Sequence, residues 1–515
     1  MNDQPRQMLR EIVARHGQSV VHHARRCEGL LKDYSAQYRR EVSVLMSALE
    51  EHVPQDLLVA PTGTPRRVLL ARLARRLSEH SALSEPAAAW AVNTWALALG
   101  SISDDELKAV EEAATLTTAV VTGDAKDVSD VSKNDDNEAR TASNKSTARV
   151  PVDAASVVAS AAGDGDYMSI MEALANVAAG GRVLVRPGVY EEAIILDKRV
   201  NIVGDGPRDE VIVRVAGASC LKSSAEAARV AGLTLRGAAG GADSFTVDVP
   251  RGELVLEDCD VSSETLSCVA VHGPSAAPLI KRCRIHDGAD SGLYFFDGAT
   301  GEVEDCEIYG HANVGVAVTG GARPTLRRSK VYGGANAGLV AWQGGETLLE
   351  GCEFYGNRLA NLGVSEGSKV TARSCQIHEG ENSGVFVHLE AEAVLEGCEL
   401  YGHRAAEAAV TTRGRLFLNG CRVHGGQDSG VLVREGGQAL LQRCEVGDNS
   451  GSGVSVGSGS VLAVIESTIY DNARFGIEVA SGATARVEDS ELTGNGLGPW
   501  DVEYGAQVES ERNHD

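Results

Sequence analysis

The sequence contains few aromatic residues and no long apolar run. Only 4% of its 515 residues are Phe, Trp or Tyr, whereas 58 are glycine. No stretch of 18 apolar residues occurs, so we expect no transmembrane helix. The net charge of −24 argues against a nucleic-acid-binding protein, because such a protein needs a basic surface.

Several functional motifs are also missing. The sequence has no C-x-x-C pair, which a typical structural zinc site requires. It has no Gly-rich phosphate loop, kinase signature or nucleophile elbow. The opening MNDQPRQMLREIVARHG has no apolar segment typical of a signal peptide. We therefore expect a cytoplasmic protein with no cofactor or metal, whose eleven cysteines are reduced thiols.

Composition divides the chain into regions of different character. Residues 1–101 carry apolar stripes with helical spacing, which predicts an α-helical module. Residues 102–150 are polar and charged, which predicts a flexible, disordered linker. Residues 151–498 hold short β-type segments after an amphipathic capping helix at about 168–179, where Ser169 and Glu172 form a capping-box pattern. Residues 499–515 are predicted to be a polar C-terminal tail.

A cysteine recurs through the third region at nearly constant spacing. The steps are 24 or 23 residues, or 46 where one position is skipped, in the series Cys259, Cys283, Cys306, Cys352, Cys375, Cys398, Cys421 and Cys444. Ser329 fills the skipped position, and Ser467 and Ser490 continue the series. A glycine usually follows nine residues later, and apolar residues keep fixed offsets. Such self-similarity indicates stacked repeats that share one core.

Each repeat offers three short runs with alternating polarity and no helix-length segment. This pattern predicts an α + β multidomain chain whose C-terminal domain is a parallel β-helix with three short strands per coil. Coils would lie about 4.8 Å apart. Outward columns such as Glu257, Lys281, Glu304 and Arg327 alternate in charge, which disfavours slipped registers. The cysteine column is predicted to face inward as a ladder of small apolar side chains.

Two parts of the sequence resemble known families. The passage GDGDYMSIMEALANVAAGGRVLVRPGVYEEAIILDKRVNIVGDG resembles the opening of pectin-lyase-like right-handed β-helix proteins. The coils from Cys259 to Leu492 resemble their C-x-I … G-V-x-V … P-x-L repeats. This resemblance covers about residues 164–498 and implies a right-handed, single-stranded parallel β-helix. Residues 6–100 resemble a helical module of bacterial multidomain signalling proteins, which implies no reaction.

An aromatic column marks one candidate binding face. Three residues after successive cysteines stand rings that begin at His286, and the predicted binding residues are Tyr309, Tyr332, Tyr355, His378, Tyr401 and His424. Rings on a polar ridge can stack on sugars or anchor a protein. The alternative is a structural stack of rings that closes a turn. The histidines are two or four coils apart, so they are too distant to share a metal ion.

Candidates for catalysis are fewer. His286, Asp287 and Asp290 in HDGADSG are the best acid–base candidates, but aspartate or asparagine is also ordinary in turns. The resemblance implies clustered aspartates, a calcium site or a Gln–Asp pair in enzymes of this fold, and no such constellation is complete here. The uniform turns also favour a protein that is not an enzyme.

The sequence therefore predicts a non-catalytic scaffold or adaptor. The β-helix would present an extended surface to a protein partner, and the helical module would recruit a signalling partner. The alternative is a carbohydrate-binding protein or a carbohydrate-active enzyme that acts on a polysaccharide, as pectin lyases, polygalacturonases and pectinesterases do. Neither interpretation involves nucleic acid or a membrane.

Overall fold

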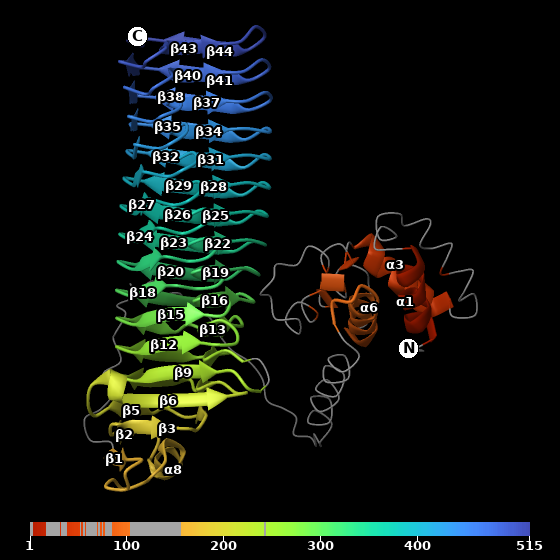
Figure 1. Cartoon of the computed structure of the whole chain (residues 1–515), viewed down its shortest axis with the longest axis vertical. Coiled ribbons are helices and arrows are strands. Elements are labelled where there is room, and N and C mark those ends of the chain that lie inside the picture. Colours follow the sequence, from red (N-terminus) through yellow and green to blue (C-terminus); the bar gives the residue numbers. More distant parts are fainter. Residues whose placement is uncertain are drawn as a thin grey trace, which may run out of the picture. The chain divides into compact units, whose positions relative to one another are not determined.

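The computed structural model describes residues 156–241 and 244–514, and parts of the N-terminal region, chiefly residues 4–16, 39–51 and 85–102. The chain divides into two compact units, Met1–Ala148 and Arg149–Asp515, both drawn in Figure 1. The linker predicted for residues 102–150 lies almost wholly outside the described residues. Within the described residues, no helix is long and apolar enough to cross a membrane.

Three helices make up most of the described N-terminal unit: α1 (Gln4–His16), α3 (Arg39–Glu50) and α6 (Glu85–Ala98). Leu9, Leu45 and Trp95 are fully buried in their shared core. Trp95 Nε1 also donates a hydrogen bond to the carbonyl of Leu45 at 3.0 Å. The predicted α-helical character is thus confirmed for these ranges.

The C-terminal unit is a parallel β-helix with three sheets, whose coils are stacked one above another in Figure 1. We call the sheets A, B and C. Sheet A contains, in order, β1 (Ser156–Ala159), β2 (Arg182–Val185), β5 (Asn201–Gly204), β8 (Ala227–Ala231), β11 (Glu253–Glu257), β14 (Leu279–Lys281), β17 (Thr300–Glu304), β20 (Arg323–Arg327), β23 (Glu346–Glu350), β26 (Lys369–Arg373), β29 (Glu392–Glu396), β32 (Arg415–Asn419), β35 (Gln438–Gln442), β38 (Val461–Ile465), β41 (Thr484–Glu488) and β44 (Gln507–Glu511).

Sheets B and C have fourteen strands each. Sheet B contains, in order, β3 (Gly188–Tyr190), β6 (Val211–Ala216), β9 (Thr234–Ala238), β12 (Asp260–Ser263), β15 (Arg284–Gly288), β18 (Glu307–Tyr309), β21 (Lys330–Tyr332), β24 (Glu353–Tyr355), β27 (Gln376–His378), β30 (Glu399–Tyr401), β33 (Arg422–His424), β36 (Glu445–Gly447), β39 (Thr468–Tyr470) and β42 (Glu491–Thr493). Sheet C contains β4 (Ile194–Leu196), β7 (Leu221–Ser223), β10 (Val247–Val249), β13 (Val269–His272), β16 (Leu293–Phe296), β19 (Val316–Val318), β22 (Leu339–Ala341), β25 (Leu362–Val364), β28 (Val385–Val387), β31 (Ala408–Val410), β34 (Val431–Val433), β37 (Val454–Val456), β40 (Phe475–Val479) and β43 (Gly498–Val502).

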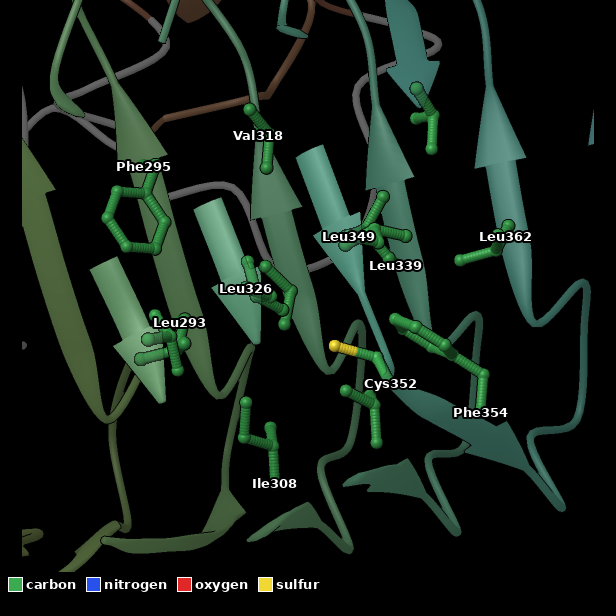
Figure 2. Packing of buried hydrophobic residues seen from close by; sticks show 14 of the residues in the cluster. Leu293, Phe295, Ile308, Val318, Leu326, Leu339, Leu349, Cys352, Phe354 and Leu362 are labelled. Atoms are coloured by element: carbon green, nitrogen blue, oxygen red, sulfur yellow. The ribbon is translucent and has the colours of Figure 1, made fainter. Parts of the chain in front are cut away.

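The core is one continuous column of apolar side chains inside the coils. All three sheets contribute residues to it, for example Leu293 from sheet C, Ile308 from sheet B and Leu326 from sheet A, which Figure 2 shows pointing into the same interior. The register follows the predicted period, since Leu326 lies beside Leu349. The side chains of one coil therefore pack on their own equivalents in the next.

The cysteine column faces inward, as predicted. The ten described cysteines are free and buried. The Cys306 backbone N–H donates to Ser329 Oγ at 3.1 Å, just as the Cys283 N–H donates to Cys306 Sγ at 3.4 Å. Cys306 Sγ also donates to the Glu304 carbonyl at 3.2 Å. The column therefore requires a small side chain that both accepts and donates a hydrogen bond, which explains why serine replaces cysteine.

The alternating charges on sheet A are confirmed as neighbours. Lys281 lies beside Glu257, with Nζ 3.1 Å from a carboxylate oxygen. In later coils Arg327 contacts Glu350 at 2.8 Å, and Arg373 contacts Glu396 at the same distance. Each exposed ion pair contributes less than about 1 kcal/mol to the free energy of unfolding. The ladder mainly disfavours registers that would place like charges together.

The recurring glycine nine residues after the cysteine is a close-approach position. A Cβ atom added to Gly292 would lie 2.6 Å from the carbonyl oxygen of Gly315, and one added to Gly315 would lie 2.6 Å from that of Gly338. The adjacent coil leaves no room for a side chain there. Two coils break this rule with buried polar residues, Asn361 and Glu407.

In both coils the polar residue contacts a second buried polar residue four positions earlier. Asn357 Nδ2 donates to Asn361 Oδ1 at 2.7 Å. In the other coil, His403 Nδ1 forms a very short contact with the Glu407 carboxylate, and both side chains are fully buried. The same carboxylate accepts the His403 backbone N–H at 2.9 Å. His403 and Glu407 therefore form a buried histidine–carboxylate contact.

The predicted capping helix is shorter than its expected range of 168–179. It is α8 (Ile170–Asn176), and Ser169 Oγ accepts the Glu172 N–H at 3.2 Å. The sequence analysis did not identify Glu192, whose carboxylate accepts from the backbone N–H groups of Ile170 and Met171 at 2.7 and 2.9 Å. A carboxylate at a helix N-terminus is favourable because it meets unpaired donors and the positive end of the dipole.

The C-terminal end differs from its prediction. Residues 499–515 were predicted to be a polar tail, yet β43 and β44 lie largely within them and extend sheets C and A by a further coil. Asn513 takes the place of the cysteine, since its Oδ1 accepts the Ser490 N–H at 2.9 Å. Because an amide can accept the same hydrogen bond as a serine hydroxyl, the ladder continues without cysteine.

Candidate functional site

The predicted ring column lies on the outer face of sheet B as one continuous stack. Neighbouring ring centroids are 4.7–5.4 Å apart with interplanar angles of 1–11° along the series His286, Tyr309, Tyr332, Tyr355, His378, Tyr401 and His424. Each inner ring therefore has both faces covered by its neighbours. What the column offers a ligand is ring edges and hydroxyl groups. Burial raises the pKa of Tyr309, Tyr332, Tyr355 and Tyr401, so these hydroxyls remain protonated.

The two later histidines of the column, His378 within it and His424 at its end, are tied to carboxylates one coil earlier. His378 Nε2 lies 3.2 Å from Glu353, and His424 Nε2 lies 3.1 Å from Glu399. These contacts fix the ring planes in the stacked orientation. The geometry fits the structural alternative, a stack that stabilises the turn, while the binding role of the column stays a prediction.

The three acid–base candidates of the sequence are only partly brought together. His286 Nδ1 lies 2.8 Å from the Asp287 carboxylate, and its Nε2 lies 3.0 Å from Asp260. Asp290 makes other contacts, accepting from Ser267 Oγ and Asn313 Nδ2, both at 2.9 Å. Both nitrogens of His286 are therefore occupied, and Asp290 belongs to a separate hydrogen-bond network.

Asp260, which sequence reasoning did not single out, is the centre of this cluster. Its carboxylate also contacts Arg236 and Arg284, each at 2.6 Å. Burial acts to raise the pKa of Asp260, but the His286 hydrogen bond and the Arg236 charge outweigh burial and lower it. In turn, the hydrogen bond to Asp260 raises the pKa of His286 against the effect of burial. The cluster thus favours a protonated imidazole.

Replacing His286 by tyrosine, the residue of the next coil, is expected to remove a pH-dependent part of the stability. Because the folded-state pKa of His286 is raised, its contribution is complete below the unfolded value near 6.5 and is lost as pH rises through the folded value. We expect the variant to lose about 1 kcal/mol of unfolding free energy at low pH, since solvent partly screens the contact between His286 and Asp260. Denaturant midpoints of both proteins from about pH 5 to pH 9 should converge at high pH; a constant difference would contradict this interpretation.

A groove of about 660 Å³ runs beside the ring column across six coils. Its floor is made of small residues that recur in each coil, including Gly310, Gly333 and Gly334. Charged residues lie at its two ends, Glu264 and Asp287 at one and Arg358 and Glu381 at the other. The floor glycines already donate to the next coil, as Gly333 does to Tyr355 at 3.3 Å. The groove therefore offers a ligand a concave surface, whereas the backbone N–H groups of these glycines are already used between coils.

A second cluster, on the outer face of sheet C, combines acid–base groups with aromatic rings. Asp248 lies beside Lys222 of the preceding coil, with the Lys222 Nζ at 2.8 Å from Oδ2. Its other oxygen lies 2.9 Å from His272 Nε2 of the following coil. We call Lys222, Asp248 and His272 the sheet C triad. One carboxylate thus bridges two basic side chains from neighbouring coils.

Exposure within the triad increases outward from the carboxylate. The side chain of Asp248 is 12% exposed, that of His272 30% and that of Lys222 51%. Burial acts to raise the pKa of Asp248, but hydrogen bonds from His272 and Lys222 outweigh it and lower the pKa. Asp248 is therefore an anion, and His272 Nε2 donates to it. Among the described residues, Nδ1 of His272 has no hydrogen-bond partner.

Aromatic rings flank the triad on the side of the next coils. His272 stacks on Phe296 with centroids 4.8 Å apart, and Phe296 stacks on Tyr294 at 4.5 Å. Tyr294 also lies 6.5 Å from the Trp342 ring at an interplanar angle of 9°. The triad and these rings form one contiguous cluster of charged, hydrogen-bonding and aromatic groups, in which Tyr294 and Phe296 are buried. Such a mixture is typical of sites that recognise polar ligands with apolar faces.

The sequence analysis missed the sheet C triad because two of its three residues lie before the regular repeat. Lys222 and Asp248 precede Cys259, the first residue of the cysteine series, and their coils do not keep the 23-residue step. The residue eleven positions after a repeat cysteine is aromatic in two coils, Tyr294 after Cys283 and Phe386 after Cys375. Inspection of that position in every coil would have identified these rings. Among the described residues, no group of His, Cys, Asp or Glu is arranged to hold a metal ion.

Comparisons with known proteins agree with the fold. A family model for the right handed beta helix region matches residues 267–414 and 384–514. No curated protein matches the chain. Among solved structures, it is similar to the periplasmic alginate epimerase AlgG, at 13% identity over 64% of this chain and 78% of that one, with a TM-score of 0.42.

Two further solved structures show a comparable likeness. The A-module of the mannuronan C-5 epimerase AlgE4 of Azotobacter vinelandii has 16% identity over 64% of this chain and 90% of that one, with a TM-score of 0.35. The catalytic unit of a GH87 alpha-1,3-glucanase from Streptomyces thermodiastaticus has 13% identity over 67% of this chain and 65% of that one, with a TM-score of 0.42. At these values the likeness is one of fold alone.

These comparisons correct the functional prediction. The sequence analysis favoured a non-catalytic scaffold that binds proteins and recruits a signalling partner. The solved structures similar to the chain are instead carbohydrate-active enzymes, which agrees better with the alternative interpretation. The uniform turns led to the error, because they were taken to exclude catalysis, and the irregular coils before Cys259 were not considered.

The family match and the sheet topology support each other. The matched residues 267–514 contain most of the strands whose parallel order defines sheets A, B and C. The C-terminal unit of the chain is therefore a right-handed parallel β-helix.

Proposed function

We propose that the β-helix unit is a carbohydrate-active enzyme whose polysaccharide substrate binds on the outer face of sheet C. The observation that carries this proposal is the bridging position of Asp248 between Lys222 and His272. A carboxylate that orients a histidine, with a lysine beside it, is an arrangement suited to proton transfer. Trp342, a half-buried ring 6.5 Å from Tyr294 in the cluster beside it, offers an aromatic contact for a sugar.

Each triad residue has a distinct role in this proposal. Asp248 accepts the Nε2–H of His272 at 2.9 Å, so the neutral imidazole keeps its basic lone pair on Nδ1. His272 then takes a proton from the substrate or, once protonated, returns one. The half-exposed ammonium of Lys222 can stabilise negative charge that develops on the sugar. Asp248 acts as a positioning residue.

The Asp260–His286 cluster on sheet B is less suited to this chemistry. His286 contacts a carboxylate through each ring nitrogen, so neither nitrogen is available to a substrate. Asp290 is buried and bonded to Ser267 and Asn313. The triad on sheet C, by contrast, keeps one histidine nitrogen without a partner among the described residues.

The proposal is tested by incubating the full-length protein with alginate, mannuronan, α-1,3-glucan and polygalacturonate in deuterated buffer. We expect at least one polymer to gain reducing ends, unsaturated ends or ring-bound deuterium, since proton transfer leaves one of these marks. Each product is measured separately by reducing-sugar assay, ultraviolet absorbance and NMR. If no polymer is altered and none binds, the proposed function is wrong.

A further inference from the structure

An apolar groove lies at the N-terminal end of sheet C, where the capping helix α8 meets β4, the first strand of that sheet. Its volume is about 360 Å³. Most of its lining is apolar and comes from Met171, Leu174, Ala175, Ile195, Leu196 and Val200. We call it the α8–β4 groove. It is separate from the groove beside the ring column, which lies over later coils.

The α8–β4 groove has a buried floor and an open, adaptable wall. Leu174 and Leu196 are buried, at 4% and 1% exposure, whereas Ile195 is 52% exposed. The Ile195 backbone N–H donates to Met171 Sδ at 3.5 Å, and a thioether sulfur is only a weak acceptor. Because methionine is flexible and polarizable, this wall can adjust to an apolar ligand.

Strand register connects the groove with the sheet C triad. Ile195 of β4 lies beside Lys222, and Lys222 lies beside Asp248. The exposed end of the groove is therefore one coil step, about 4.8 Å, from Lys222 and two steps, about 9.6 Å, from Asp248. Since the Lys222 ammonium reaches Asp248 at 2.8 Å, its apolar stem joins the groove to the charged triad.

We propose that the substrate of the triad is an amphiphilic carbohydrate, in which an acidic sugar bound at Lys222 and His272 carries a hydrocarbon chain that occupies the α8–β4 groove. The half-exposed ammonium of Lys222 favours a carboxylate on the sugar. The hydrocarbon chain would remove Ile195 and Met171 from water. This proposal rests on the proposed function and names its substrate class.

The volume of the groove sets the length of the hydrocarbon chain. A closed cavity of about 150 Å³ holds benzene, which has six carbons, so an open groove of about 360 Å³ has room for a chain of about ten carbons. Full burial of one methylene group would tighten binding about fourfold, and partial burial in an open groove about twofold. Affinity should therefore rise with chain length up to about ten carbons and then level off.

The test measures calorimetric binding of n-alkyl glucuronides with two to fourteen alkyl carbons to the full-length protein, each below its micelle concentration. We expect Ile195→Thr to weaken decyl glucuronide about three- to tenfold and to leave ethyl glucuronide unchanged. Ile195→Val should retain most of the affinity. The matched control is Val189→Thr, because Val189 is 54% exposed on β3 of sheet B and does not line the groove. This control should bind decyl glucuronide as the wild type does.

Two further ligands identify what the groove recognises. Decanoate carries a hydrocarbon chain and a carboxylate without a sugar, and phosphatidylcholine vesicles present hydrocarbon as a membrane surface. Both should bind more weakly than decyl glucuronide. The proposal is overturned if decanoate or the vesicles bind as tightly, if affinity does not depend on alkyl length, if Val189→Thr loses as much as Ile195→Thr, or if no alkyl glucuronide binds.

The result is separable from the test of the proposed function. If a polysaccharide is turned over while affinity for alkyl glucuronides does not depend on alkyl length, the amphiphilic substrate is wrong and the function stands. If decyl glucuronide binds through Ile195 but no carbohydrate reacts, the function is wrong and the α8–β4 groove remains a binding site for an amphiphilic carbohydrate.

Discussion

Replacing His272 by alanine is expected to lower kcat on the reactive polysaccharide by about 10²- to 10⁴-fold, the usual contribution of a general acid or base. His272 is the triad member whose Nδ1 has no partner among the described residues. KM should change little, because the exposed Lys222 and the half-buried Trp342 remain. The side chain is 30% exposed, so the denaturant midpoint should stay close to that of the wild type.

The His272→Ala variant is compared with substitutions that remove a positive charge and leave the His272 imidazole in place. Lys222→Gln removes the neighbouring positive charge and should lower kcat less than His272→Ala does. Its matched control is Lys369→Gln, since Lys369 forms a similar pair with Glu392, at 2.7 Å, on sheet A. The control should keep full activity. A His272→Ala protein that retains more than about a tenth of the wild-type kcat would contradict the acid–base role.

Replacing Glu407 by alanine is expected to destabilise the β-helix by about 3–5 kcal/mol, the usual cost of breaking a buried ion pair. His403 and Glu407 are both fully buried and in direct contact. Without the carboxylate, His403 keeps only its contact with Asn361, at 2.9 Å, and its backbone N–H loses an acceptor. Denaturant unfolding of the full chain gives the loss as a shift in midpoint.

A designed double variant provides the control for this loss. His403→Asn with Glu407→Gly reproduces the coil two repeats later, where Asn449 Oδ1 accepts the Gly426 N–H at 3.0 Å and Gly453 occupies the close-approach position. We expect this variant to recover most of the stability lost by Glu407→Ala. If the single variant is as stable as the wild type, the enclosed pair has no structural role.

The β-helix could be predicted from the sequence because its interior repeats with the chain. Cys306 and Ser329 occupy equivalent positions since both accept a backbone N–H from the coil before, and this shared chemistry keeps the 23-residue step visible. The alternating charges of Glu257 and Lys281 gave independent support for the register. Both signals depend on direct contact between neighbouring coils, so they appear in any sequence that forms such a stack.

Where a coil uses other residues for the same contact, the pattern is lost. Asn513 replaces the cysteine in the last coil, and the polar composition there led to the wrong prediction of a tail. The sheet C triad was missed for a related reason. Lys222 and Asp248 belong to coils of irregular length, so no constant step relates them, and only the strand register places them side by side.

The ring column of sheet B shows a different limit of sequence reasoning. The spacing identified His286, Tyr309 and the later rings as one column, and the rings do stack. Spacing alone does not report which ring surfaces remain open. The stacked geometry covers the faces of the inner rings, which favours a structural role.

The account is tested most directly by a crystal structure of the full-length protein with a bound mannuronan hexamer. We expect sugar density on the outer face of sheet C, with one sugar unit within hydrogen-bond distance of His272 Nδ1. Sugar density along the groove and rings of sheet B, with the face of sheet C empty, would contradict it.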